Sequence, residues 1–155
     1  MGFFSKLADA VTGGGVKVGL QWSETGLGKP VEVKVTAVVA ERDRDIAGVY
    51  LLILADEKVI VHNVKVFERI GDQIQEKIED VTETVTTFSQ KVALAGAQTL
   101  KAGQTYEWTG SFVIPADKRP SYMGVNAKHA WQIKAGLDAK GNDPDSGWFE
   151  IPVGP

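Results

Sequence analysis

Two histidines and an acidic segment near the C-terminus are the residues of this sequence best suited to chemistry. The histidines are His62 and His129, and a zinc site would need three or four ligands that converge on the ion. Nothing in the sequence brings the two histidines together. A hydrogen-bonded histidine at the margin of the core is the simpler interpretation of His129.

The acidic segment contains Asn142, Asp143 and Asp145, whose oxygen atoms are of the kind that hard cations prefer. Their spacing does not fit an EF-hand loop, and an Asx-type turn before a strand explains the same residues. The sequence also lacks a nucleophile elbow, a phosphate-binding loop and a dinucleotide fingerprint. We therefore expect a protein that is not an enzyme and binds no cofactor or metal. A hydrolase or metal enzyme built on the histidines and this turn is the weaker alternative.

The composition narrows the class of protein. A chain of 155 residues with 43% hydrophobic and 24% charged residues is ordinary for one globular domain. The net charge is −3, and acidic and basic residues are interspersed along the chain. The sequence therefore contains no basic patch that would predict nucleic-acid binding. The absence of cysteine removes disulfides and thiol chemistry. Because we find neither signal-peptide features nor a membrane-spanning apolar run, we expect a cytoplasmic protein.

The first 15 residues form a segment of their own. Apolar residues recur at helical spacing over residues 2–12, which predicts a short amphipathic helix that ends at the glycines 13–15. Such a short helix needs cover for its apolar face. That face either docks on the chain's own domain or contacts a partner or a membrane surface, and its candidate contact residues are Phe3, Phe4, Leu7 and Val11. A single lysine on the polar face argues against a membrane.

Residues 16–155 alternate between apolar and polar side chains in many short runs, which predicts a single β-sandwich domain. The clearest run is 103–115, where Tyr106, Trp108, Gly110 and Phe112 share one face. We predict about eight strands, with residues 41–45 as a hairpin loop, 56–58 as a turn and 68–80 as an irregular or short helical connection. No alternation of strands and helices is visible, so an antiparallel, immunoglobulin-like sandwich is expected.

Four pieces of the chain resemble a known family in their order. They are Phe-Phe-Ser-Lys-Leu before the glycine-rich joint, the segment 31–54, the segment 100–115 and the segment 131–138, which is followed by Asp-Pro-Asp at 143–145. Together they resemble the N-terminal domain of arrestins, and in pattern most closely the bacterial arrestin-like proteins of the sporulation-control family. That family usually carries a second sandwich, and the matched pieces belong to the first.

The resemblance implies an arrestin-like fold and a regulatory adaptor that binds other proteins, linked to sporulation or stress-type control in a bacterium. It also implies a polar cluster at Asp138, Asp143 and Asp145, with Arg119 as a candidate partner. From the residues themselves, we expect protein partners to bind by strand pairing at an exposed sheet edge or along a sheet face. The candidate edges are 59–67 and 81–94. The same edges could join two copies into a homodimer. The alternative function is a peripheral membrane protein that uses the N-terminal helix.

Overall fold

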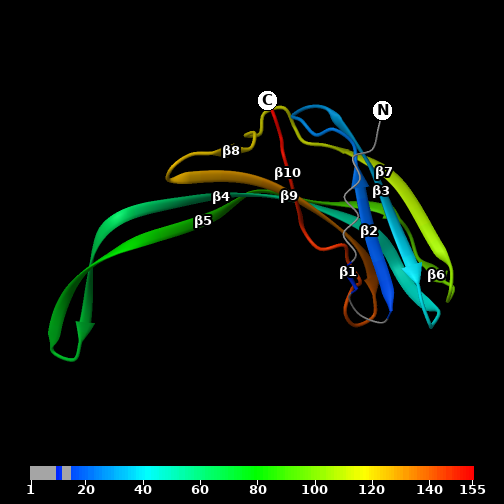
Figure 1. Ribbon diagram of the computed structural model, residues 1–155, viewed down its shortest axis with the longest axis horizontal. Helices are drawn as coiled ribbons and strands as arrows, with labels where there is room; N and C mark the ends of the chain where they lie inside the picture. The colour runs from blue at the N-terminus through cyan, green and yellow to red at the C-terminus, as the bar shows by residue number, and fades with distance from the viewer. Residues whose placement is uncertain (1–9, 12–14) are drawn as a thin grey trace.

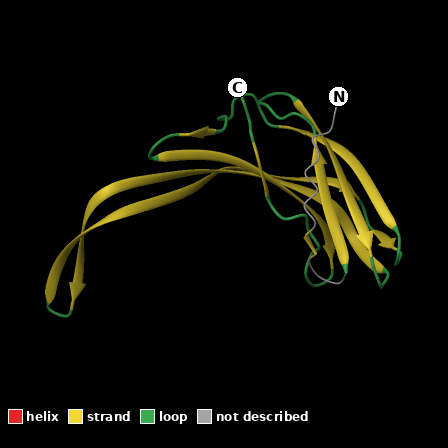
Figure 2. Ribbon diagram, viewed as in Figure 1, coloured by secondary structure: helices red, strands yellow, loops and turns green. Residues whose placement is uncertain are grey.

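The computed structural model describes residues 10–11 and 15–155, with side chains from residue 15 onward. All regular elements in this part of the chain are strands joined by turns and loops (Figure 2). They are β1 (Ala10–Val11), β2 (Val16–Trp22), β3 (Pro30–Val39), β4 (Arg44–Ile70), β5 (Gln73–Ala95), β6 (Gln98–Leu100), β7 (Thr105–Val113), β8 (Tyr122–Met123), β9 (Ala127–Ala139) and β10 (Phe149–Ile151).

The strands form two antiparallel sheets that pack against each other at one end of the molecule (Figure 1). The first sheet has the order β1-β2-β3-β7. The second has the order β10-β9-β4-β5, with β6 on β4 and β8 on β9. The predicted all-β antiparallel sandwich is confirmed, although the described residues form ten strands rather than about eight.

The period-two pattern of the sequence builds the core between the sheets. In β3 the side chains of Val31, Val33 and Val35 are buried while their neighbours are not. From the other sheet, β9 contributes Trp131, which is fully buried and packs against Phe88 at a ring-centroid distance of 5.2 Å. Each large apolar side chain buried in this way contributes about 1.5–3 kcal/mol to folding. The alternation therefore fixes which face of each strand points inward.

Three predicted connections are wrong. Residues 41–45 do not close a hairpin, because β3 and β4 belong to different sheets and the chain crosses between them. Residues 56–58 do not form a turn, because β4 runs through them with a register shift next to Asp56. Residues 68–80 belong to β4, a turn at residues 71–72 and β5. The helical prediction came from Ile70, Ile74 and Ile78 at a spacing of four residues. Ile74 and Ile78 share a face of β5, because a spacing of four residues fits a strand as well as a helix.

The helix predicted over residues 2–12 is not shown. Ala10–Val11 form β1, in which Val11 pairs with Lys17 of β2. Phe3, Phe4, Leu7 and the rest of the predicted helix lie outside the described residues. Among the residues that the structure describes, no helix has the length and apolar character needed to cross a bilayer.

Candidate interaction site on the β4–β5 arm

The largest departure from a closed sandwich is the extension of β4 and β5 beyond it (Figure 1). The pairing of β9 with β4 ends at Ala127 and Val59. Beyond this point, within the described residues, β4 and β5 pair only with each other. We call residues 60–82 the arm. A two-stranded ribbon of this kind is marginally stable in water by itself.

The arm is held in register by cross-strand charge pairs. Lys65 Nζ lies 3.4 Å from Glu76 Oε1 and Lys77 Nζ lies 3.3 Å from Glu68 Oε2, both across the two strands. Lys77 Nζ also lies 3.5 Å from Glu79 Oε2 of its own strand. The bond to Glu68, and then Glu79, raises the pKa of Lys77. Exposed pairs such as these each contribute about 0–1 kcal/mol. They therefore select the strand register more than they add stability.

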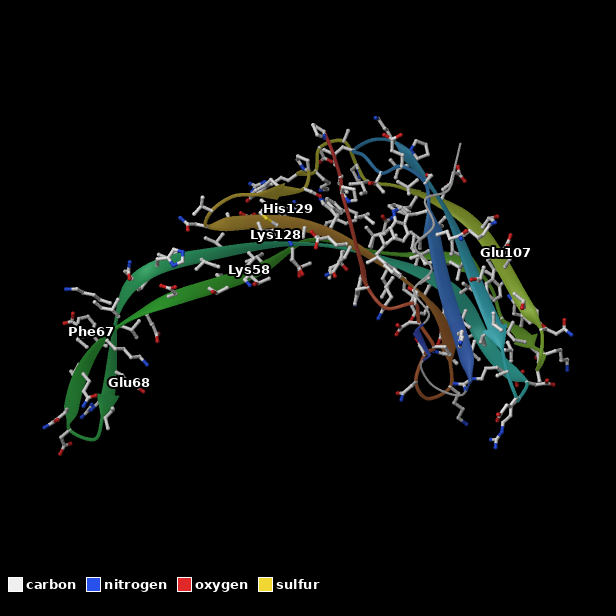
Figure 3. All side chains as sticks on the ribbon, in the orientation of Figure 1. Lys58, Phe67, Glu68, Glu107, Lys128 and His129 are labelled. Carbon is white, nitrogen blue, oxygen red and sulfur yellow. The ribbon has the colours of Figure 1, made fainter. Side chains whose placement is uncertain are left out.

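A β-bulge lies within the arm. Val61 pairs with Val81 and Val64 with Glu79, so His62 and Asn63 together oppose the single residue Asp80. Asn63 has a φ of 57°, and asparagine tolerates this left-handed conformation better than most residues. Bulges bend the strand that carries them. In Figure 3 the segment with Phe67 and Glu68 runs at an angle to the root of the arm.

The carboxylate of Asp80 holds the bulge together. Its Oδ1 accepts a hydrogen bond of 3.2 Å from the backbone N–H of Asn63, and its Oδ2 lies 2.9 Å from His62 Nδ1. The bond to His62, followed by that to Asn63, lowers the pKa of Asp80. The bend is thus a property of three neighbouring residues and does not depend on the sandwich.

Apolar side chains are exposed on both faces of the arm. Phe67 pairs with Glu76, Arg69 with Ile74 and Lys65 with Ile78, and directly opposed residues share a face of a sheet. Phe67, Ile74 and Ile78 therefore share one face, where they are diagonal neighbours that alternate with the three charged residues; we call them the apolar stripe, and their exposures are 66%, 72% and 63%. On the other face Val61 and Val81 lie opposite each other and are also exposed. Exposed apolar side chains on both faces make the arm a candidate interaction surface.

The arm also has two open edges that differ in charge. The outer edge of β5 has no partner strand among the described residues, and its residues 73–86 carry four acidic side chains against one lysine, a net charge of −3. The outer edge of β4 is open from Val61 to Ile70 within the described part of the chain, and carries Lys65 and Arg69 against Glu68, a net charge of +1. Both predicted edge segments, 59–67 and 81–94, lie on these two strands.

The acidic residues of the predicted polar cluster gather around Tyr50 of β4. The Tyr50 hydroxyl donates a hydrogen bond of 2.8 Å to Asp143 Oδ2. Burial of the phenol, followed by that bond and the negative charges of Asp145 and Asp138, raises its pKa far above the ordinary value. Asp145 lies 3.8 Å from Lys134. Sequence reasoning missed Tyr50, because it is hidden in an apolar run and its partner is 93 residues away.

Arg119 lies elsewhere, at the root of the arm. Its Nη1 is 3.1 Å from Glu57 Oε2, so Glu57 is the acidic partner that the structure gives to this arginine. Nearby, His129 is buried beside Trp131. Its Nδ1 lies 2.9 Å from the Pro120 carbonyl and must donate there. Its Nε2 lies 2.7 Å from Thr87 Oγ1, so His129 ties the loop before β8 to the second sheet.

The two histidines of the sequence therefore have different structural roles. His129 is a fully partnered core residue, and His62 is an exposed residue of the bulge. No group of three or more histidine, aspartate and glutamate side chains among the described residues is placed to hold a metal ion. The acidic turn at Asn142–Asp145 supplies one carboxylate oxygen of Asp143 to the backbone N–H of Ala139 at 3.0 Å, as a turn residue does.

Comparison with known proteins identifies a solved structure with a similar fold. No family model matches the chain, and no curated protein matches it. Among solved structures, the crystal structure of Spo0M, a sporulation control protein from Bacillus subtilis, is similar with a TM-score of 0.62 and 18% identity. The match covers 92% of this chain and 50% of that chain, so this chain spans about half of Spo0M. The arrestin-like fold predicted from the sequence is thereby confirmed.

Proposed function

We propose that this protein is a non-enzymatic regulatory adaptor that binds an extended segment of a partner protein along the open edge of β5. The observation that carries the proposal is an unpaired, acidic edge strand on an arm that extends beyond the sandwich. We propose that the adaptor acts in sporulation or stress-type control in the bacterial cytoplasm. The similarity in fold to a sporulation control protein supports this proposal.

The backbone of β5 supplies the affinity in this mode of binding. An extended peptide that adds itself to a sheet edge pairs with its free N–H and C=O groups, and the side chains select the sequence. Natural proteins usually protect such edges with lysine, proline or short strands. Between Lys77 and Lys91, β5 contains neither a lysine nor a proline. The charged side chains on this edge are acidic, so it disfavours pairing with a like edge and is suited to strand addition by a basic segment.

The charge of the edge selects the partner. Glu76, Glu79, Asp80 and Glu83 give the β5 edge its negative charge. Complementary charge favours association and excludes the wrong partners. We therefore expect a partner segment rich in lysine or arginine, with apolar residues that contact the exposed valines or the apolar stripe. Because the charges are exposed, binding should weaken as the salt concentration rises.

A site-specific crosslinking experiment tests this proposal. The chain has no cysteine, so Thr84→Cys places one photoreactive maleimide on the exposed β5 edge. Val38→Cys, at 45% exposure on the first sheet, is the matched control. After illumination in native extract, we expect an adduct at position 84 only, which maps to a basic extended segment of one protein.

The specificity of that adduct is checked with a second change. Replacing Glu79 and Glu83 by glutamine in the Thr84→Cys protein should reduce the adduct several-fold, as should high salt, because both remove the charge complementarity. Equal adducts from positions 84 and 38, or an adduct that is insensitive to both treatments, would overturn the proposal.

A further inference from the structure

We propose that the β4 edge of the arm pairs with the same edge of a second copy, antiparallel and centred on Val66. The β4 edge lies on the opposite side of the arm from the proposed partner site on β5. The arm consists of only two strands. A ribbon of two strands is marginally stable alone, and three or more strands are needed for independent stability.

The β4 edge is free where the pairing would occur. The last backbone hydrogen bond on the β9 side joins the Ile60 N–H to the Asn126 carbonyl, at 2.8 Å. From Val61 to Ile70 the outer edge of β4 has no partner strand within the described residues. Open edges present alternating N–H and C=O groups that template another strand.

The composition of this edge fits a second copy better than the β5 edge does. Five of its ten residues, 61–70, are valine, isoleucine or phenylalanine, and its charges sum to +1. The β5 edge carries −3 over residues 73–86, so two copies joined there would place like charges against each other, which is destabilising. Self-association is therefore favoured at β4 and disfavoured at β5.

Symmetry and charge restrict the register. In an antiparallel pair related by a twofold axis normal to the sheet, the central residue faces itself and its neighbours face each other on the same side. A centre at Lys65, Glu68 or Arg69 would place identical charges opposite each other. A centre at Phe67 would place Lys65 opposite Arg69. All four registers are thus unfavourable.

Four apolar centres, Val61, Val64, Val66 and Ile70, remain. A centre at Val61 lies beside the bulge, and a centre at Ile70 would carry the pairing into the turn at residues 71–72. A centre at Val64 would carry the pairing through the bulge at His62 and Asn63, where the edge is irregular. A centre at Val66 pairs residues 64–68 of the two copies, and this stretch lies on the regular segment beyond the bulge. This register places each Lys65 opposite Phe67 of the other copy, with no like charges directly opposed. The register centred on Val66 is therefore the one that fits.

The resulting dimer has a consequence for binding. Its arms form one sheet of the order β5-β4-β4-β5, so the edge of β5 stays free on both sides. A dimer with two partner sites can bind a multivalent target with much higher avidity than either site alone. Pairing of β4 with β5 of the next copy would instead give open-ended assemblies.

Disulfide trapping tests the register directly. Val66→Cys in this cysteine-free chain places two thiols opposite each other across the proposed axis. Mild oxidation should give mostly disulfide-linked dimer, several-fold more than Val85→Cys, which is a 54% exposed valine on β5. A dimer yield for Val66→Cys no higher than for Val85→Cys would overturn the proposal.

Sedimentation of uncrosslinked proteins provides a second test. The unmodified chain should sediment as a dimer at micromolar concentration, Val66→Lys as a monomer and the matched Val85→Lys as a dimer. Circular dichroism establishes that each variant is folded. A monomeric unmodified chain, or species that grow beyond a dimer with concentration, would overturn the pairing. The Thr84 crosslinking experiment can succeed in the Val66→Lys monomer, so the two proposals fail separately.

Discussion

The backbone N–H of Asn63 donates a hydrogen bond to the Asp80 carboxylate across the bulge of the arm, at 3.2 Å. Asn63 is the only residue other than glycine with a positive φ in the described residues. This pair therefore fixes the direction of the arm tip through a local contact. Because both proposed binding edges lie on the arm, the geometry of this contact bears on each of them.

We expect Asn63→Val to disturb the bend. A β-branched residue in the left-handed region costs about 1–2 kcal/mol, so the bulge should reorganise. Spin labels at Asp72→Cys in the turn and Val38→Cys on the sandwich report the distance between them. The distribution should shift or broaden in Asn63→Val and remain unchanged in Asn63→Gly, because glycine accepts this backbone conformation. Identical distributions in all proteins would contradict the role of Asn63.

His62→Ala should raise the pKa of Asp80 toward its ordinary value of 3.8, because the bond to His62 is the main cause of its lowering. A lowered folded pKa stabilises the arm above pH 3.8, and this contribution is lost as the pH falls through the folded value. Carboxyl NMR titration measures the shift. Asp43, whose pKa is lowered mainly by the backbone N–H of Ala102, serves as the control and should not change.

Gly136→Ala should destabilise the sandwich. Gly136 pairs with Tyr50, and a Cβ at position 136 would overlap the Tyr50 ring. The ring would have to move away from Asp143, at a cost of about 1–3 kcal/mol for overpacking. Urea unfolding measures the loss. Gly96→Ala is the matched control, since no atom lies within 4 Å of its Cβ, and its midpoint should be equal to or above that of the unmodified protein.

Removal of the arm should leave the sandwich folded. Replacing residues 60–82 by Asn-Gly would join the opposed residues Val59 and Glu83 through a two-residue hairpin turn. None of the residues in the buried core cluster belongs to the arm. We expect calorimetry to give a melting temperature within a few degrees of the full chain, and sedimentation to give a monomer. Loss of cooperative unfolding would show that the arm is part of the folding unit.

Much of the fold could be predicted from the sequence, because the pattern that defines a strand is set by neighbouring residues. Period-two alternation requires only that a strand has one buried face. For this reason Val31, Val33, Phe112 and Trp131 were predictable as inward-facing residues, and each is buried. The arrestin-like order of the strands was also predictable from the sequence. The connections 41–45 and 68–80 were not, because their interpretation depends on which distant strand each neighbour pairs with.

The residues of the candidate sites were likewise predictable only in part. The acidic group at Asp138, Asp143 and Asp145 was predicted from the resemblance to the arrestin family. The sequence did not identify Tyr50, and it offered Arg119 as a partner when the structure pairs Arg119 with Glu57. Hydrogen-bond partners 62 and 93 residues apart leave no periodic signal.

The sequence by itself determined that residues 59–67 and 81–94 are strands, through their content of valine, isoleucine and threonine. Only the tertiary structure decided that these strands continue past the sandwich and form an arm with two open edges. The physical reason is that strand propensity belongs to single residues. Whether a strand edge is covered depends on where the neighbouring strand ends, which here is the pair of Val59 with Ala127.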